Sequence, residues 1–300
     1  MVWAFDGPWR NFWPLVLLPL LAGFISDRCS RAFPLVGVSH RCAIALAALP
    51  GLVTIGLMVV ALWQALPRGI PHSVDAFILG VMTPAFAALL LVHATTRAGS
   101  RAAQLHRLRG LSRPATGRLA IAAQVVGVIA RELPTRDIEC FISGFWRPIA
   151  YVSRGAVDSL SDDQLRAVLQ HERAHGQAGD ARMFPILSFL SDLAPMTGRA
   201  MDAYRRAREQ HADRVAARCA GVVPLASALL IMARGHGTDA ALSMAAVGGA
   251  WRLELLLGVA VPAPMSRRNR AGITAGILSN LLLASWPLPH VALLYVYCTG

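Results

Sequence analysis

The sequence predicts a mainly helical, polytopic membrane protein that carries one mixed α+β domain between its membrane-spanning helices. The first observation is composition, since hydrophobic residues make up 55% of the 300 residues and charged residues only 15%. A soluble globular domain has about a quarter of its residues charged. The second observation is that the apolar residues gather in long runs bordered by arginine. Together these features predict segments that lie in lipid.

Four apolar runs have the character of membrane spans. A helix needs about 20 predominantly apolar residues to cross the hydrocarbon core of a bilayer. The runs that approach or exceed this length are residues 11–26, 43–66, 76–95 and 272–297. The first run is the shortest, and for it a buried core helix is the competing interpretation.

The arginines that border these runs predict how the chain is oriented. They concentrate after the first run, after the third run and before the fourth, and arginine-rich loops belong in the cytoplasm. We therefore expect a membrane region with an outside N-terminus at 1–95, a cytoplasmic domain at 96–270, and a last span with an outside C-terminus at 271–300. A channel or transporter is disfavoured, because the runs hold few ionisable residues.

The formal net charge of +12 has two physical interpretations. Strong basicity suits either nucleic acid or an anionic membrane surface. The sequence shows neither zinc-finger spacing nor a pattern of stacking aromatic residues. We therefore expect a lipid bilayer as partner and no direct binding of nucleic acid.

The middle region predicts helices and one short β-hairpin. Two β-rich segments, 138–142 and 148–153, are separated by Gly144, which suits a hairpin. Ser161-Asp162-Asp163-Gln164 forms a capping-box pattern, which predicts the start of a helix over 165–176. Further helices are predicted at 119–130, 200–220, 224–234 and 240–261.

The predicted helix at 165–176 carries the motif His-Glu-x-x-His. Two histidines four residues apart lie on the same helix face, so His171 and His175 can converge on one zinc ion. Glu172 lies beside that position, where a general base can take a proton from a water that zinc activates. The competing interpretation is a solvated helix face that happens to carry two histidines.

The sequence Glu209-Gln210-His211-Ala212-Asp213 begins 34 residues after His175 and offers the third metal ligand that a catalytic zinc site still needs. Glu209 offers the third ligand of a His₂Glu set, which leaves the fourth position for water. Asp213 lies one turn further on the same face and can accept the free N–H of a ligand histidine. The competing interpretation is a surface acidic pair among arginines. We expect one zinc ion per chain.

The segment before the motif predicts where a substrate would bind. Ala150, Tyr151 and Val152 lie in the β-rich segment just upstream of the motif helix. An edge strand at this place can hold a peptide in extended form by backbone pairing. The alternative is an ordinary strand inside a sheet.

These residues resemble the BlaR/MecR antirepressor family of membrane zinc metallopeptidases, whose sites are of the gluzincin type. Residues 144–155 are similar to the family's strand and turn before the active helix, and Ser161–His175 is close to that helix itself. Asp180 fits the family's extension of the motif, for which the resemblance implies a structural or supporting role. Glu209 and Asp213 match the family's third ligand and its partner.

The resemblance implies a cytoplasmic zincin-like domain that performs regulated, site-specific endopeptidase cleavage. The implied substrate is the protein itself or a transcriptional repressor. Antibiotic sensors of the family carry an outside penicillin-binding domain after the last span, whereas the sequence given stops at Gly300. We therefore expect no covalent β-lactam site, and a signal that arrives through the spans, a short loop or a partner.

Two alternatives remain at this point. The HtpX and CAAX-prenyl-protease family shares both motifs, which would make the chain a membrane quality-control peptidase. A catalytically silent membrane regulator would keep its cellular function after Glu172→Gln. The sequence does not indicate an oligomeric state. A zinc peptidase usually also carries a group that stabilises the oxyanion, and the candidates are Tyr204, His211, His236 and Arg252.

Overall fold

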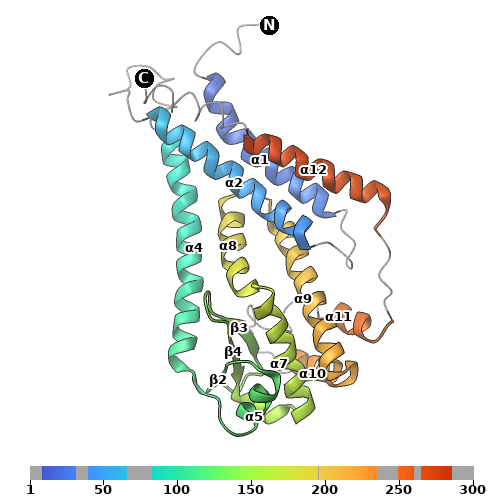
Figure 1. The fold of residues 1–300 in the computed structure, drawn as a ribbon. Coiled ribbons are helices and arrows are strands. Elements are labelled where there is room, and N and C mark those ends of the chain that lie inside the picture. Colours follow the sequence, from blue (N-terminus) through green and yellow to red (C-terminus); the bar gives the residue numbers. More distant parts are fainter. Residues whose placement is uncertain are drawn as a thin grey trace.

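A computed structural model describes residues 9–31, 40–65, 83–194, 196–234, 249–259 and 265–285. The first part of the third predicted span, the second half of the fourth and His236 lie outside these residues. Four long helices are seen in Figure 1: the first, second and last of them along the chain lie in its upper part, and the third runs from there down alongside the lower part. They are α1 (Trp9–Arg31), α2 (His40–Ala65), α4 (Thr83–Leu111) and α12 (Arg267–Ser285).

The first and last of these helices pack closely on each other and on α2. A Cβ atom at Gly276 of α12 would overlap the Cys29 sulfur of α1, so the two backbones approach more closely than larger residues allow. Near this contact the buried Asn280 amide donates a hydrogen bond of 3.1 Å to the Ser26 hydroxyl. The two ends of the described chain therefore meet in one helical bundle.

One helix of this bundle meets the length and composition required to cross a membrane. Within the described parts of the chain it is His40–Val59, with a mean hydropathy of 2.3. The span predicted at 43–66 overlaps this segment over residues 43–59. For 11–26, 76–95 and 272–297 the structure shows helices over the residues that it describes, and crossing stays a prediction for them.

The lower part of the molecule is an α+β unit with a four-stranded sheet. The strands are β1 (Arg113–Pro114), β2 (Ala130–Leu133), β3 (Cys140–Ser143) and β4 (Ile149–Ser153), in the order β1-β2-β4-β3. β3 and β4 pair antiparallel, which confirms the predicted hairpin. A buried aliphatic core joins the sheet to α5 (Gly117–Val126), α7 (Asp162–Gln177) and α10 (Val222–Arg234).

The motif helix α7 begins where the sequence predicted. Ser161 accepts a hydrogen bond from the Gln164 backbone, and the Gln164 side chain accepts one from the Ser161 backbone. This reciprocal pair satisfies two amide groups that the helix start would leave without partners. The helix faces strand β3, because a Cβ atom at Gly176 would come within 2.7 Å of the Ile142 side chain.

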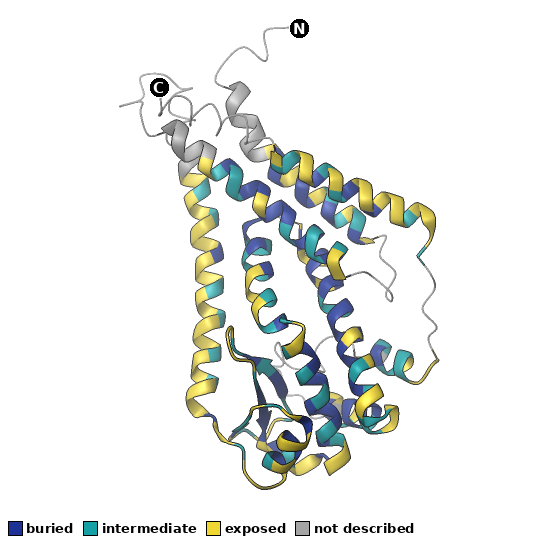
Figure 2. Ribbon diagram, in the orientation of Figure 1, coloured by how far each residue is buried: buried dark blue, intermediate teal, exposed yellow. Residues whose placement is uncertain are grey.

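Two helices connect the lower unit to the bundle. α8 (Asp180–Leu193), which the sequence did not predict, rises from the end of α7, and α9 (Gly198–Ala220) returns beside it (Figure 1). A Cβ atom at Gly51 of α2 would overlap the Leu190 backbone, so α8 packs directly against α2. Figure 2 shows α9 largely buried, in contrast to the exposed length of α4. The lower unit is thus not separate from the helices above it.

Candidate metal centre

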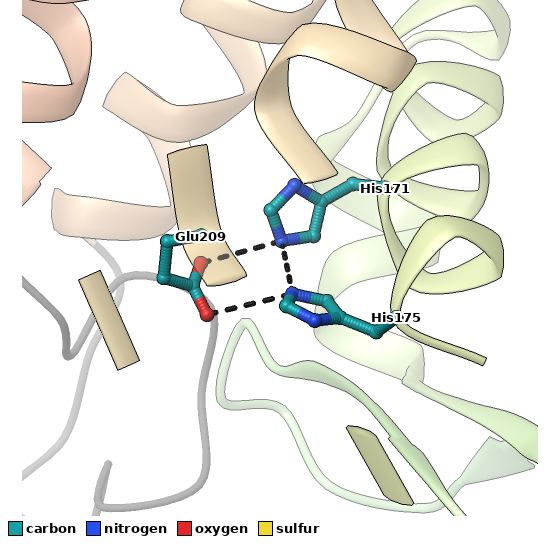
Figure 3. A group of neighbouring side chains, drawn as sticks. All are labelled: His171, His175 and Glu209. Atoms are coloured by element: carbon teal, nitrogen blue, oxygen red, sulfur yellow. Dashed lines mark hydrogen bonds and ion pairs between the residues drawn. The ribbon is translucent and has the colours of Figure 1, made fainter. Parts of the chain in front are cut away.

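The two histidines of the motif lie on one buried face of α7. His171 is fully buried and His175 nearly so. Their Nε2 atoms lie 3.0 Å apart and point toward α9, as Figure 3 shows. The position of these rings follows from the helical repeat, which places residues i and i+4 one above the other.

The Glu209 carboxylate on α9 completes a group of three ligand atoms. One of its oxygens lies 3.4 Å from His171 Nε2, and the other lies 3.4 Å from His175 Nε2. Atoms that bind one zinc ion tetrahedrally at 2.0–2.1 Å lie about 3.3–3.4 Å from each other. The spacing of His171, His175 and Glu209 therefore fits a single zinc ion. A buried Glu209 oxygen without a well-aligned hydrogen bond agrees with this fit.

Each histidine has a buried carboxylate behind it. His175 Nδ1 lies 2.7 Å from Asp180, and His171 Nδ1 lies 3.0 Å from Asp213. The first pair is a hydrogen bond, whereas the second has hydrogen-bond length without good alignment. Such partners fix the ring orientation and leave Nε2 free to bind a metal. This geometry suits the supporting roles expected for Asp180 and Asp213, and the roles themselves stay a prediction.

Two buried arginines hold these carboxylates in turn. Arg208 donates to both oxygens of Asp180, at 2.7 and 2.9 Å. Arg252, on α11 (Gly249–Leu256), donates to both oxygens of Asp213, at 2.8 and 2.6 Å, and its Nη1 lies 2.9 Å from Glu209. Sequence reasoning did not foresee these ion pairs, because arginines are frequent throughout the chain and their partners are distant in sequence.

The charges of the site suit a divalent cation. Four buried carboxylates face the two buried arginines; they belong to Glu172, Asp180, Glu209 and Asp213. With both histidines neutral, this leaves two unbalanced negative charges in a region where uncompensated charge is costly. One Zn²⁺ would balance them.

Without a metal, protons partly take its place. Burial by itself lowers the pKa of His175, but the Glu209 charge and the hydrogen bond to Asp180 outweigh burial and raise this pKa to about 10. Burial also lowers the pKa of His171, and the bonds to Asp213 and Glu209 reverse its direction. The surrounding cations, Arg252 first, hold the pKa of Glu209 well below its usual value despite burial. The Glu209 carboxyl group is therefore ionised, which is the form that binds a cation.

Glu172 lies inside the same cluster. Burial raises the pKa of its carboxyl group, and the positive charges of His171 and His175 partly offset that rise. Burial also raises the pKa of the Cys140 thiol, and the charge of Glu172 raises it further. The charge of Glu172 therefore acts both on the two histidines and on Cys140 of strand β3.

Part of the chain is similar to a known protein family. Residues 122–197 match the model of peptidase family M48. M48 peptidases are zinc metallopeptidases, and the matched segment contains strands β2, β3 and β4 together with α7 and α8. Glu209, Asp213 and Arg252 lie beyond it, so their place at the site rests on the geometry above. No curated protein matches the chain.

The pairing of the strands corrects the prediction of a substrate-binding strand. Ala150, Tyr151 and Val152 lie in β4, which pairs with β2 on one side and with β3 on the other. A strand that is paired on both sides has no free backbone groups for a peptide, so this prediction was wrong. In the described sheet the outer strand beside α7 is β3.

Three of the four predicted oxyanion candidates can be placed. Tyr204 is buried and donates its hydroxyl to Asp180 at 3.1 Å. Arg252 is committed to Asp213 and Glu209. His211 is exposed on α9. Among the residues that the structure describes, Tyr204 and Arg252 therefore support the site rather than offer a donor to a substrate, while the oxyanion role of His211 stays untested.

Proposed function

We propose that the chain is a membrane-embedded zinc metalloendopeptidase that cleaves a protein substrate at a specific site. The observation that carries this proposal is the arrangement of His171, His175 and Glu209 at zinc-ligand spacing, with Glu172 beside them. The match of residues 122–197 to a peptidase family supports it independently.

The outward faces of the upper helices support a place in the membrane. Large apolar side chains are exposed on all four, for example Leu20 on α1, Leu52 on α2, Leu89 on α4 and Leu282 on α12. Exposed apolar side chains that gather into a patch mark contact with lipid or with another protein. We propose four spans, with the peptidase unit in the cytoplasm and both termini outside.

The chain's own residues have distinct tasks in peptide hydrolysis. His171, His175 and Glu209 would hold the ion, and Asp180 and Asp213 keep the two imidazoles oriented. Zinc bound here would activate a water molecule and polarise the carbonyl group of the substrate. Glu172 accepts the proton of the attacking water and passes it to the leaving amine, for which a pKa raised by burial is suitable.

Strand β3 has the unpaired backbone edge that β4 lacks. It is the outer strand of the described sheet on the side of α7. An extended peptide that pairs with this edge would pass the catalytic helix, because Gly176 of α7 packs on Ile142 of β3. We propose that β3 orients the substrate.

The regulated character of the cleavage rests on the resemblance to BlaR/MecR antirepressors. It implies that the substrate is the protein itself or a cytoplasmic repressor. A membrane quality-control peptidase remains the alternative within the same chemistry.

A comparison of protein N-termini in cells tests the activity. Cells would carry the wild-type chain, Glu172→Gln, or the matched control Asp158→Asn, which changes an exposed carboxylate of the same unit. A new N-terminus in wild-type and control cells, lost with Glu172→Gln although that variant still binds zinc, establishes proteolysis and identifies the substrate. If Glu172→Gln shows the same new N-termini as the wild type, Glu172 is not the base and the mechanism is wrong.

A further inference from the structure

The tyrosine of α9 that contacts Asp180 also packs against α2. Tyr204 is buried, and its hydroxyl donates a hydrogen bond of 3.1 Å to Asp180. Its side chain belongs to a buried apolar cluster to which α2 contributes Ala43, Leu46 and Ala47. Within the described part of the chain, α2 is the helix that is long and apolar enough to cross a membrane. One side chain thus joins the polar network behind the metal site to the packing of the helical bundle.

Two further helices complete this cluster. α8 contributes Leu187, and α12 contributes Ile273. Phe184 of α8 meets the Tyr204 ring edge to face, with centroids 5.2 Å apart. The three side chains from α2 are fully buried. Because a close-packed interior has few voids, its side chains do not shift independently of one another. A displacement of α2 at this contact would therefore also displace the Tyr204 ring.

Asp180 lies between Tyr204 and the metal ligand His175. One carboxylate oxygen of Asp180 accepts from the Tyr204 hydroxyl and from Arg208, and the other lies 2.7 Å from His175 Nδ1. Burial raises the pKa of the Tyr204 hydroxyl, and the charge of Asp180 raises it further, so this hydroxyl stays protonated and can donate. Of the two donors from α9, Tyr204 is the one that belongs to the cluster with α2.

We propose that Tyr204 is a positioning residue that couples the packing of α2 to the orientation of the His175 imidazole. While α2 keeps its place in the cluster, Tyr204 and Arg208 together hold Asp180, which orients the ring of His175. When α2 is displaced, Asp180 loses one donor and the imidazole is held less firmly, so the site binds zinc more weakly.

A movement of the membrane helices would in this way change the metal centre. The coupling is an energetic link between two parts of the molecule, and such links change a binding affinity severalfold. This inference rests on the proposed function and deepens it, because it identifies a residue through which the cleavage would be regulated.

Two leucines of α2 provide a matched pair of substitutions. Leu46 lies in the cluster of Tyr204, whereas Leu57 lies in a separate cluster with Leu18 and Ala22 of α1. Both leucines are buried. Leu46→Ala and Leu57→Ala therefore remove the same side chain from buried positions of the same helix. We expect both to lower the free energy of unfolding, and only Leu46→Ala to weaken the binding of metal.

Metal binding by the full-length protein in detergent tests the coupling without any substrate. Competition with a chelating dye gives the zinc affinity, and the absorption spectrum of bound Co²⁺ reports the geometry of its ligands. We expect Leu46→Ala to lower the zinc affinity about 2–30-fold and Tyr204→Phe to lower it about tenfold. Leu57→Ala should keep the wild-type affinity and cobalt spectrum. In the variant that combines Leu46→Ala with Tyr204→Phe the two losses should not add, because the hydroxyl through which α2 acts is already absent.

The outcomes separate the coupling from the proposed function. If the wild-type protein binds no zinc, the metal centre and the proposed function both fail. If it binds zinc but Leu46→Ala and Leu57→Ala bind zinc equally well, or Tyr204→Phe binds it as tightly as the wild type, the coupling is wrong and the metal centre stands. Losses that add fully in the combined variant would show that α2 does not act through Tyr204. Should Leu46→Ala not fold, Leu46→Val and Leu57→Val make the same comparison with smaller cavities.

Discussion

Replacing Asp213 by asparagine tests the support of the metal site most directly. The substitution keeps the shape of the side chain but removes the charge behind His171, whose Nδ1 lies 3.0 Å away. In the wild-type protein Arg252 donates to both oxygens of the Asp213 carboxylate, at 2.8 and 2.6 Å. The substitution places an amide against Arg252 instead. Lost orientation of the imidazole and lost negative charge both weaken the binding of a cation.

The expected magnitude follows from these contacts. Loss of a carboxylate behind a histidine ligand lowers metal affinity about 10–100-fold, which corresponds to about 1.4–2.8 kcal/mol. Breaking one side of a buried ion pair lowers the free energy of unfolding by about 3–5 kcal/mol. We expect the lower end of that range, because Glu209 still contacts Arg252.

Zinc affinity can be measured by competition with a chelating dye, and stability by thermal unfolding in detergent with and without zinc. Asp202→Asn is the matched control, since Asp202 lies on the same helix but is exposed and pairs with the exposed Arg205. We expect the control to change stability by less than about 0.5 kcal/mol. A folded Asp213→Asn protein that binds zinc as tightly as the control would refute the assigned role of Asp213.

Three further predictions concern the metal-free protein and its packing. The folded pKa of His175, about 10, exceeds its unfolded value of 6.5, so protonated His175 stabilises the metal-free protein fully below about pH 6.5 and loses this effect as the pH rises through about 10. Unfolding measured at a series of pH values should show this loss of stability only in the absence of zinc, because zinc displaces the proton. Gly51→Leu should lower the free energy of unfolding by at least about 1–3 kcal/mol, because the leucine side chain would overlap the Leu190 backbone. Gly99→Ala is the control and should not destabilise the protein, because the space around Gly99 is open. Ser161→Ala should cost about 1 kcal/mol in urea unfolding through the lost helix cap, and an unchanged midpoint would show that the cap is dispensable.

Local patterns in the sequence predicted most of the helices and the hairpin. Ser161 and Gln164 predicted the start of α7 because a capping box needs only residues three positions apart. Gly144 predicted the hairpin because a tight turn needs a residue without a side chain. By contrast α8 was not predicted, because its apolar face has a partner only when α2 and α4 lie against it. These contacts join distant residues, for example Arg101 to Asp192, 91 positions apart, and Gly51 to Leu190, 139 positions apart.

The residues of the candidate site also fall into those that a local pattern predicted and those that only the fold brought together. The sequence by itself determined that His171 and His175 lie on one helix face, since the helical repeat requires it, and that Glu172 lies beside them. It also identified Glu209 and Asp213 as the acidic residues to seek. Only the tertiary structure decided that α9 brings Glu209 within 3.4 Å of both imidazoles. Tertiary packing likewise left β3 rather than β4 at the sheet edge and placed Arg208 and Arg252 among the buried carboxylates, because these contacts depend on how distant segments pack and no local pattern records them.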